Sequence, residues 1–206
     1  MRTLTKELQQ NMSPTDAIEL LKEGNKRFVN NLKVNRNLLQ QVNETRNSQH
    51  PFAVIISCMD SRTSAELIFD QGLGDIFSIR IAGNVINDDI LGSTEFGCKV
   101  VGAKVVLVLG HTSCGAINGA IDDVSFGHIH FITHKIQRCI PSAKSHFESD
   151  AVKTFVDLVT TENVLLAMQD LRSRSSIIAE LERTNNIQII GGVYDVSTGI
   201  VTFLEK

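Results

Sequence analysis

Two short polar segments hold the side chains of this chain that could do chemistry together. One is residues 58–62 (CMDSR) and the other is residues 110–115 (GHTSCG). Between them they offer two thiols, one imidazole and one carboxylate. Sulfur together with imidazole favours zinc over magnesium or calcium, which prefer oxygen ligands. The pattern therefore points to a catalytic zinc site, for which the candidate ligands are Cys58, Asp60, His111 and Cys114.

Strand-like segments must position these side chains. Residues 52–57 (FAVIIS), 76–81 (IFSIRI) and 105–109 (VVLVL) are short, apolar and rich in β-branched side chains. Each is followed by a polar or glycine-containing turn and a stretch compatible with a helix, which predicts a parallel sheet buried on both faces. Sites in open α/β sheets form beyond the carboxyl ends of the strands. The two polar segments should therefore converge if the first and third strands are neighbours.

The N-terminal region, about residues 1–48, has the pattern of an amphipathic helical arm. Ser13 is a predicted N-cap, with Pro14 at the first helical position and Asp16 completing a capping box. Apolar side chains then recur at roughly helical spacing, at Ile18, Leu21, Phe28 and Val29. This arm could pack on its own sheet or on a second subunit.

The remainder of the chain completes an α/β pattern. After Cys114 the pattern is mainly helical to about residue 184. Residues 187–190 and 200–204 then look like two late strands, separated by a turn at residues 197–199. There is no internal repeat and no linker-like stretch. We interpret residues 1–206 as one domain with a mostly parallel central β-sheet flanked by helices.

Composition excludes several classes of function. The 206 residues suit one domain, and 42% hydrophobic with 21% charged residues is typical of a globular protein. A net charge of −3 without a dense Lys/Arg run argues against nucleic acid or an anionic membrane as a partner. No apolar run is long enough to span a membrane and no signal-peptide pattern is present, so we expect a cytoplasmic protein. Its four cysteines then indicate free thiols or metal ligands instead of disulfides.

Other catalytic motifs fail on spacing. Ser64 occupies the position that the arginine of a C-x5-R phosphatase loop would need, and Ser113 is out of register for a G-x-S-x-G nucleophile elbow. Gly72 and Gly74 precede a strand-like run instead of following one, which argues against a dinucleotide-binding loop. The zinc hypothesis is therefore the one that the spacing supports.

Three motifs together resemble the β-class carbonic anhydrases. They are CMDSR at residues 58–62, RIAGN at residues 80–84 and GHTSCGA at residues 110–116, and the resemblance runs over about residues 13–203. It implies reversible hydration of carbon dioxide to bicarbonate and a proton at a zinc ion. It also implies an α/β fold whose N-terminal helices embrace a second subunit, giving a homodimer or a higher multiple of dimers.

The resemblance assigns a role to each candidate site residue. Cys58, His111 and Cys114 would be permanent ligands of one zinc ion per chain. Asp60 would either take the fourth position or pair with Arg62, which can hold a carboxylate by two parallel hydrogen bonds and so leave Asp60 to orient the nucleophile. The positions that line the substrate pocket in plant-like members correspond here to Gln49, Phe77, Gly83 and Asn84.

Two departures from the family pattern affect the pocket and its regulation. Phe96 stands where plant-like members often carry a pocket tyrosine, which removes a hydroxyl group. Ile55 replaces the tryptophan that marks the bicarbonate-regulated bacterial members, so we do not expect that inhibitory site.

Some alternatives remain open at this point. The same zinc motif would serve hydrolysis of carbonyl sulfide or carbon disulfide, and a closed four-ligand site would favour a zinc-binding module without catalysis. Cys98 and Cys139 are expected to be buried structural thiols, each on a predicted helix. The cluster of His128, His130 and His134 favours a solvated helix start over a proton shuttle or a metal site.

Overall fold

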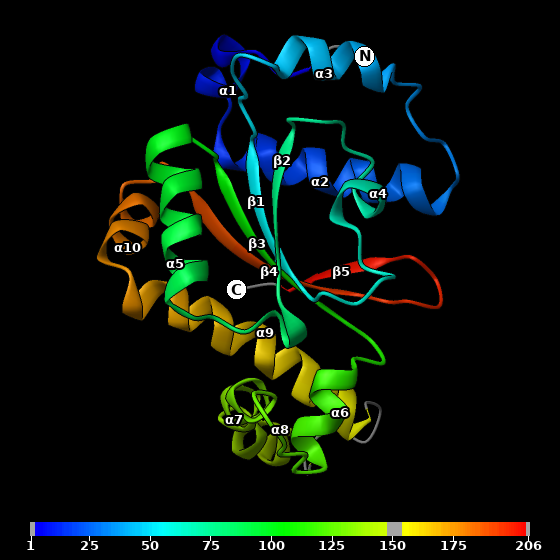
Figure 1. Ribbon diagram of the computed structural model, residues 1–206, viewed down its shortest axis with the longest axis vertical. Helices are drawn as coiled ribbons and strands as arrows, with labels where there is room; N and C mark the ends of the chain where they lie inside the picture. Colours follow the sequence, from blue (N-terminus) through cyan, green and yellow to red (C-terminus); the bar gives the residue numbers. More distant parts are fainter. Residues whose placement is uncertain (1–2, 148–153, 205–206) are drawn as a thin grey trace.

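A five-stranded sheet organises the molecule (Figure 1). The computed structural model describes residues 3–147 and 154–204. The strands lie in the order β2-β1-β3-β4-β5, with parallel pairing throughout except for the antiparallel pair β4–β5. Their bounds are β1 Ala53–Ser57, β2 Ile76–Arg80, β3 Val105–His111, β4 Gln188–Tyr194 and β5 Val201–Leu204. The predicted mostly parallel sheet is confirmed.

Two strands run further than the sequence pattern predicts. β3 extends through His111, so this histidine ends the strand instead of following it. β4 continues past residue 190 through two glycines to Tyr194. A Cβ on Gly191 would lie 2.8 Å from the sulfur of Met168, so the glycine is required by the close approach of a helix and does not mark the end of the strand.

Helices surround the sheet, and their order follows the predicted pattern. After the third strand the described residues are mainly helical as far as Arg183, as expected. The N-terminal capping box at Ser13 is present in full, with Pro14 at the start of its helix. The helices are α1 Lys6–Asn11, α2 Pro14–Val29, α3 Leu38–Thr45, α4 Ala65–Ile68, η1 Ala82–Asn84, α5 Asp88–Glu95, η2 Phe96–Val101, α6 Gly115–Ile121, α7 His130–Gln137, α8 Ile140–Phe147, α9 Phe155–Arg174 and α10 Ser176–Arg183.

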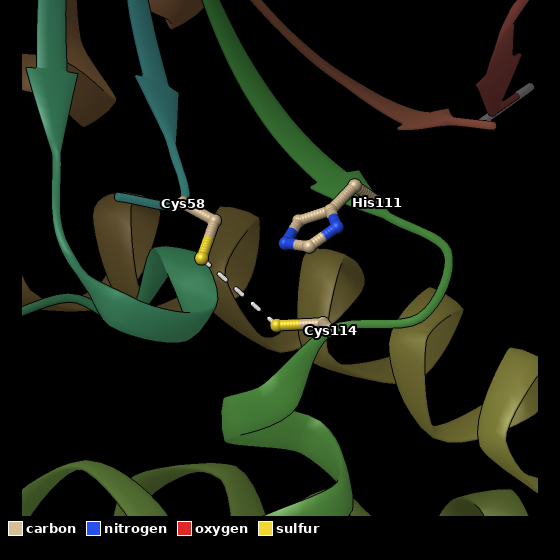
Figure 2. A group of neighbouring side chains, drawn as sticks. All are labelled: Cys58, His111 and Cys114. Carbon is tan, nitrogen blue, oxygen red and sulfur yellow. Dashed lines mark hydrogen bonds between the residues drawn. The ribbon is translucent and has the colours of Figure 1, made fainter. Parts of the chain in front are cut away.

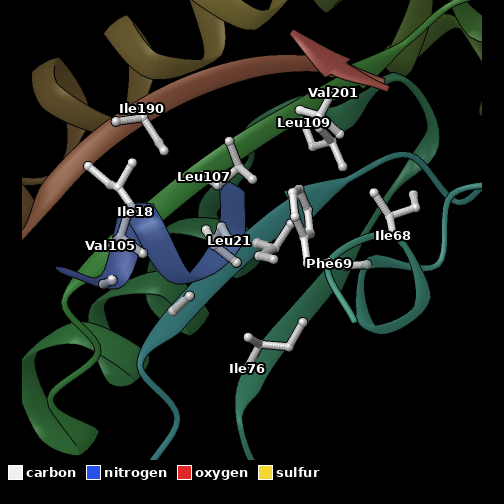
Figure 3. Packing of buried hydrophobic residues seen from close by; sticks show 14 of the residues in the cluster. Ile18, Leu21, Ile68, Phe69, Ile76, Val105, Leu107, Leu109, Ile190 and Val201 are labelled. Atoms are coloured by element: carbon white, nitrogen blue, oxygen red, sulfur yellow. The ribbon is translucent and has the colours of Figure 1, made fainter. Parts of the chain in front are cut away.

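Each face of the sheet has its own apolar core. Side chains alternate across the strands, so Ile55 and Leu107 face α2 and α4, while Val54 and Ile56 face α5, α9 and α10. Figure 3 shows the first of these cores, in which Leu21 of α2 packs among strand side chains. Burying one such aliphatic side chain contributes about 1.5–3 kcal/mol. The helix α2 therefore belongs to the core of its own chain.

The remainder of the N-terminal arm is more exposed. α3 presents an apolar stripe of Leu38, Leu39 and Val42 to solvent. The Nε2 of Gln9 on α1 donates to the carbonyl oxygens of Pro51 (2.7 Å) and Val101 (3.2 Å) and so ties the arm to the amino ends of the strands. Among the described residues no helix is long and apolar enough to cross a membrane.

A third cluster lies beyond the carboxyl ends of the strands. It is built by α6, α7, α8 and the first part of α9, which gather at the bottom of Figure 1. Cys139 is buried there, but it lies in the turn between α7 and α8 and not within a helix. Pro141, the second residue of α8, marks this break, because proline is favoured in the first turn of a helix and disfavours a helical conformation in the residue before it. The extent of the domain, residues 1–206, stays a prediction.

Candidate metal centre

Three predicted ligands meet at the carboxyl edge of the sheet (Figure 2). Cys58 directly follows β1, His111 ends β3, and Cys114 is the N-cap residue of α6. Because β1 and β3 are neighbours in register, their ends lie side by side. The ligand atoms of the three residues all lie within 4.8 Å of one another, and the two sulfur atoms are 3.9 Å apart. The expected convergence of the two polar segments is confirmed.

The donor set fits a zinc ion. The imidazole Nδ1 of His111 lies 2.9 Å from the carbonyl oxygen of Thr112 and donates to it, which leaves the lone pair on Nε2. Nε2 is buried and has no hydrogen-bond partner among the described residues, a costly arrangement unless a cation binds there. One imidazole and two thiolates supply three of the four tetrahedral positions that zinc prefers, leaving one for a further ligand.

The two thiols influence each other's ionisation. The hydrogen bond from Cys114 lowers the pKa of Cys58 to about 4, against the opposing effect of burial and with help from His111 and the backbone N–H groups of Asp60 and Gly83. The same hydrogen bond, together with burial, raises the pKa of Cys114. Burial alone would lower the pKa of His111, but the neighbouring Cys58 thiolate raises it instead. The pKa shifts of the two thiols are opposite in sign, so Cys58 ionises more readily than Cys114.

The loop that joins His111 to Cys114 is held by the end of β4. The backbone N–H of Thr112 donates to the carbonyl oxygen of Tyr194 at 2.9 Å. The Thr112 hydroxyl donates to Asp195 at 3.4 Å and accepts from the N–H of Val196 at 3.1 Å. These contacts fix the carbonyl group that orients the imidazole of His111.

Asp60 is paired with Arg62, which is one of the two arrangements expected for it. The Nε and Nη2 atoms of Arg62 donate to the two carboxylate oxygens at 2.9 and 2.8 Å, and its backbone N–H adds a third bond of 2.9 Å. The hydrogen bond from Arg62 holds the pKa of Asp60 well below its ordinary value despite partial burial. Asp60 therefore stays ionised beside the metal-binding group. Its predicted role as a fourth ligand stays a prediction.

Arg80 lies in one of the three motifs, but its role was not predictable from the sequence. Its guanidinium group donates to the carbonyl oxygens of Cys58 and Asp60, at 3.2 Å in the first case. The hydroxyl of Thr63 donates to the same two carbonyl groups at 2.9 Å. Together they fix the loop that carries Cys58 and Asp60. The only signal in the sequence was the position of Arg80 at the carboxyl end of its strand.

Gly83 lies against the metal-binding group, and Asn84 follows it in the same turn. The N–H of Gly83 donates to the sulfur of Cys58 at 3.4 Å. Gly83 has a φ of 63°, and a Cβ there would lie 2.7 Å from Ile136, so this turn requires glycine. The Nδ2 of Asn84 is buried without a hydrogen-bond partner among the described residues. A role of either residue in substrate binding stays a prediction.

Gln49 and Phe77 do not reach the metal-binding group within one chain. Gln49 is exposed and precedes β1, at the end of the strand opposite Cys58. Phe77 lies near the amino end of the edge strand β2, where it pairs in register with Val54. Together with Phe96 it lines a surface cavity of about 550 Å³ between β2 and α5. The order of Gln49, the predicted strand 52–57 and Cys58 along the chain already implies this separation for Gln49.

The other candidate residues show the burial or exposure that the sequence predicts. Cys98 and Cys139 are buried, and burial raises the pKa of each thiol to about 12, which is typical of structural cysteines. His128 precedes α7, His130 begins it and His134 lies in its last turn, and all three are exposed, in agreement with a solvated helix.

Sheet and site together define the class of protein: an α/β protein whose buried Cys/His/Cys group, able to hold a metal ion, lies beyond the carboxyl ends of parallel strands. The family model described as "Carbonic anhydrase" matches residues 53–201. "Carbonic anhydrase 2" of Mycobacterium tuberculosis is 36% identical over 194 residues, which cover 92% of each chain. The chain belongs to the β-class carbonic anhydrase family, an enzyme family of carbonate dehydratases.

Further relatives agree in sequence and fold. "Carbonic anhydrase" of Mycolicibacterium smegmatis is 34% identical over 195 residues, which cover 93% of each chain. The solved structure of a Coccomyxa β-carbonic anhydrase in complex with acetazolamide shares the fold, with a TM-score of 0.72 at 23% identity. That alignment covers 80% of this chain and 76% of the Coccomyxa chain.

Proposed function

We propose that this chain is a zinc-dependent carbonic anhydrase that hydrates carbon dioxide reversibly to bicarbonate and a proton. The observation that carries the proposal is the buried group of Cys58, His111 and Cys114, with ligand atoms within 4.8 Å, beside an ionised carboxylate. Zinc in such a group supplies a Lewis acid that activates water for attack on the substrate carbon, as in carbonic anhydrases generally.

The Asp60–Arg62 pair supports an open, catalytic site. A structural zinc site would be closed by four protein ligands, but both carboxylate oxygens of Asp60 accept hydrogen bonds from Arg62. Each carboxylate oxygen has two lone-pair directions, and the second one on Oδ2 is available to a reacting group. We infer that Asp60 orients the nucleophile by accepting its hydrogen bond, while Arg62 keeps the carboxylate in place.

We also propose a homodimer or a multiple of dimers. The exposed apolar stripe of α3 offers a surface for a second subunit. If Gln49 and Phe77 do line the substrate pocket, a second copy of the chain must supply them, because within one chain they lie away from Cys58. Two β-carbonic anhydrases of Sordaria macrospora with the same fold are described as tetrameric. A cytoplasmic location stays a prediction.

A stopped-flow assay of carbon dioxide hydration tests the proposed function. The purified protein should contain about one zinc ion per chain and lose activity on treatment with a chelator. Cys58→Ala should lose both zinc and activity, whereas Cys98→Ala, which removes a buried thiol away from the site, should keep both. Full zinc occupancy in Cys58→Ala would contradict the ligand assignment. Turnover of carbonyl sulfide above that of carbon dioxide would favour the alternative hydrolase.

A further inference from the structure

The helix α9 places a buried asparagine behind the metal-binding group. Asn163 is 3% exposed, and its Nδ2 donates to the carbonyl oxygen of Gly83 at 2.8 Å, across 80 positions of the chain. A buried amide group is costly unless it is hydrogen-bonded, so this contact holds the helix and the turn together. α9 also packs against β3 and β4, which makes it a rigid support for the turn.

Gly83 connects this asparagine to a zinc ligand. Its carbonyl group accepts from Asn163, while its N–H donates to the sulfur of Cys58 at 3.4 Å. The turn Ala82–Asn84 has a left-handed glycine in its middle, with φ 63° and ψ 20°. Glycine has few intrinsic conformational restraints, so the hydrogen bond from Asn163 to its carbonyl group helps to fix where its N–H points.

We propose that Asn163 is a positioning residue that, through Gly83, maintains the N–H···S hydrogen bond on Cys58 and so sets how much charge this sulfur donates to the zinc ion. The inference rests on the proposed function and deepens it. A zinc ion with two thiolate ligands receives more negative charge than one with three histidines and is a weaker acid. A hydrogen bond to one sulfur withdraws part of that charge. Asn163 would therefore keep the pKa that governs the pH–rate profile closer to neutral.

Asn163→Leu tests the role of the amide, because leucine is similar in size and has no donor. Thr160→Ala is the matched control: Thr160 is buried one turn earlier on α9, and its hydroxyl donates to Val156 of the same helix. In the cobalt-substituted protein, Asn163→Leu should move the sulfur-to-cobalt charge-transfer band to longer wavelength. Release of the metal to a chelator should become about 10- to 100-fold faster. The midpoint of the pH–rate profile should rise. Thr160→Ala should change none of these.

The outcomes separate this inference from the proposed function. A wild-type protein that binds no cobalt or zinc would refute the proposed function and, with it, the role of Asn163. A wild-type protein that is loaded and active, next to an Asn163→Leu protein with an unshifted band and an unchanged release rate, would overturn the role of Asn163 alone. If Asn163→Leu does not fold, Asn163→Ala, which introduces no new bulk, is measured in the same way.

Discussion

Replacement of Arg62 by alanine is the sharpest test of how this site works. The change removes the bonds of 2.9 and 2.8 Å that hold the two oxygens of Asp60 and leaves the backbone bond to Oδ1. The carboxylate can then rotate about one remaining contact. A displacement of about 1 Å in a positioning group costs on the order of 100-fold in rate. We therefore expect an Arg62→Ala protein that retains its zinc and loses activity by about that factor.

Matched variants distinguish positioning from a general loss of an ion pair. Arg183 binds Glu180 with the same two-bond geometry, at 2.8 and 2.7 Å, on the exposed face of α10. Arg183→Ala should leave the rate unchanged, and the melting temperatures of the two variants should be similar. Arg62→Lys should be intermediate, because an ammonium group cannot form the planar two-bond pair. Zinc content and stopped-flow rates are the measurements. Near-normal activity in zinc-loaded Arg62→Ala at neutral pH would refute the reasoning.

The pH dependence of the pair follows from the pKa of Asp60. The hydrogen bond from Arg62 depresses this pKa below its ordinary 3.8. A depressed carboxyl pKa means that the pairing is fully present above the ordinary pKa and is lost only as the pH falls through the lower value of the folded protein. Between pH 5 and pH 8, any change in the rate must therefore come from groups other than Asp60.

Three further predictions concern the pocket, the thiols and the assembly. Gln49→Ala should reduce kcat/KM about tenfold or more while zinc stays bound, if the amide bonds a substrate oxygen; an unchanged kcat/KM would place Gln49 outside the pocket. Cys98 and Cys139, whose pKa values burial raises to about 12, should resist a thiol reagent at pH 8 until the protein unfolds, and rapid labelling of either in the native protein would contradict their burial. Sedimentation should show at least a dimer of the 22.7 kDa chain, and a stable monomer at micromolar concentration would count against the second-subunit pocket.

Local patterns in the sequence accounted for much of the site. The apolar runs marked β1, β2 and the start of β3, and the capping box marked the start of α2. The two polar segments contained all three residues of the metal-binding group. These features were predictable because strand and helix signals, and the chemistry of sulfur and imidazole donors, depend on residue types a few positions apart.

Other features depend on contacts between distant parts of the chain. The sequence could not show that β4 continues through Gly191, because this glycine leaves room for the sulfur of Met168 on α9, which is far away along the chain. Nor could it show that Asn163 supports the turn at Gly83, 80 positions away. An asparagine within a helical pattern has no local feature that distinguishes a solvent-exposed side chain from a buried hydrogen-bond donor.

By itself, then, the sequence determined which donors are available and which elements carry them: thiols and imidazole at the ends of two strand-like runs. Only the tertiary structure decided that β1 lies beside β3, so that Cys58 and His111 meet. Strand order and orientation result from packing the whole sheet between its helices, a balance of many long-range contacts that no short segment contains.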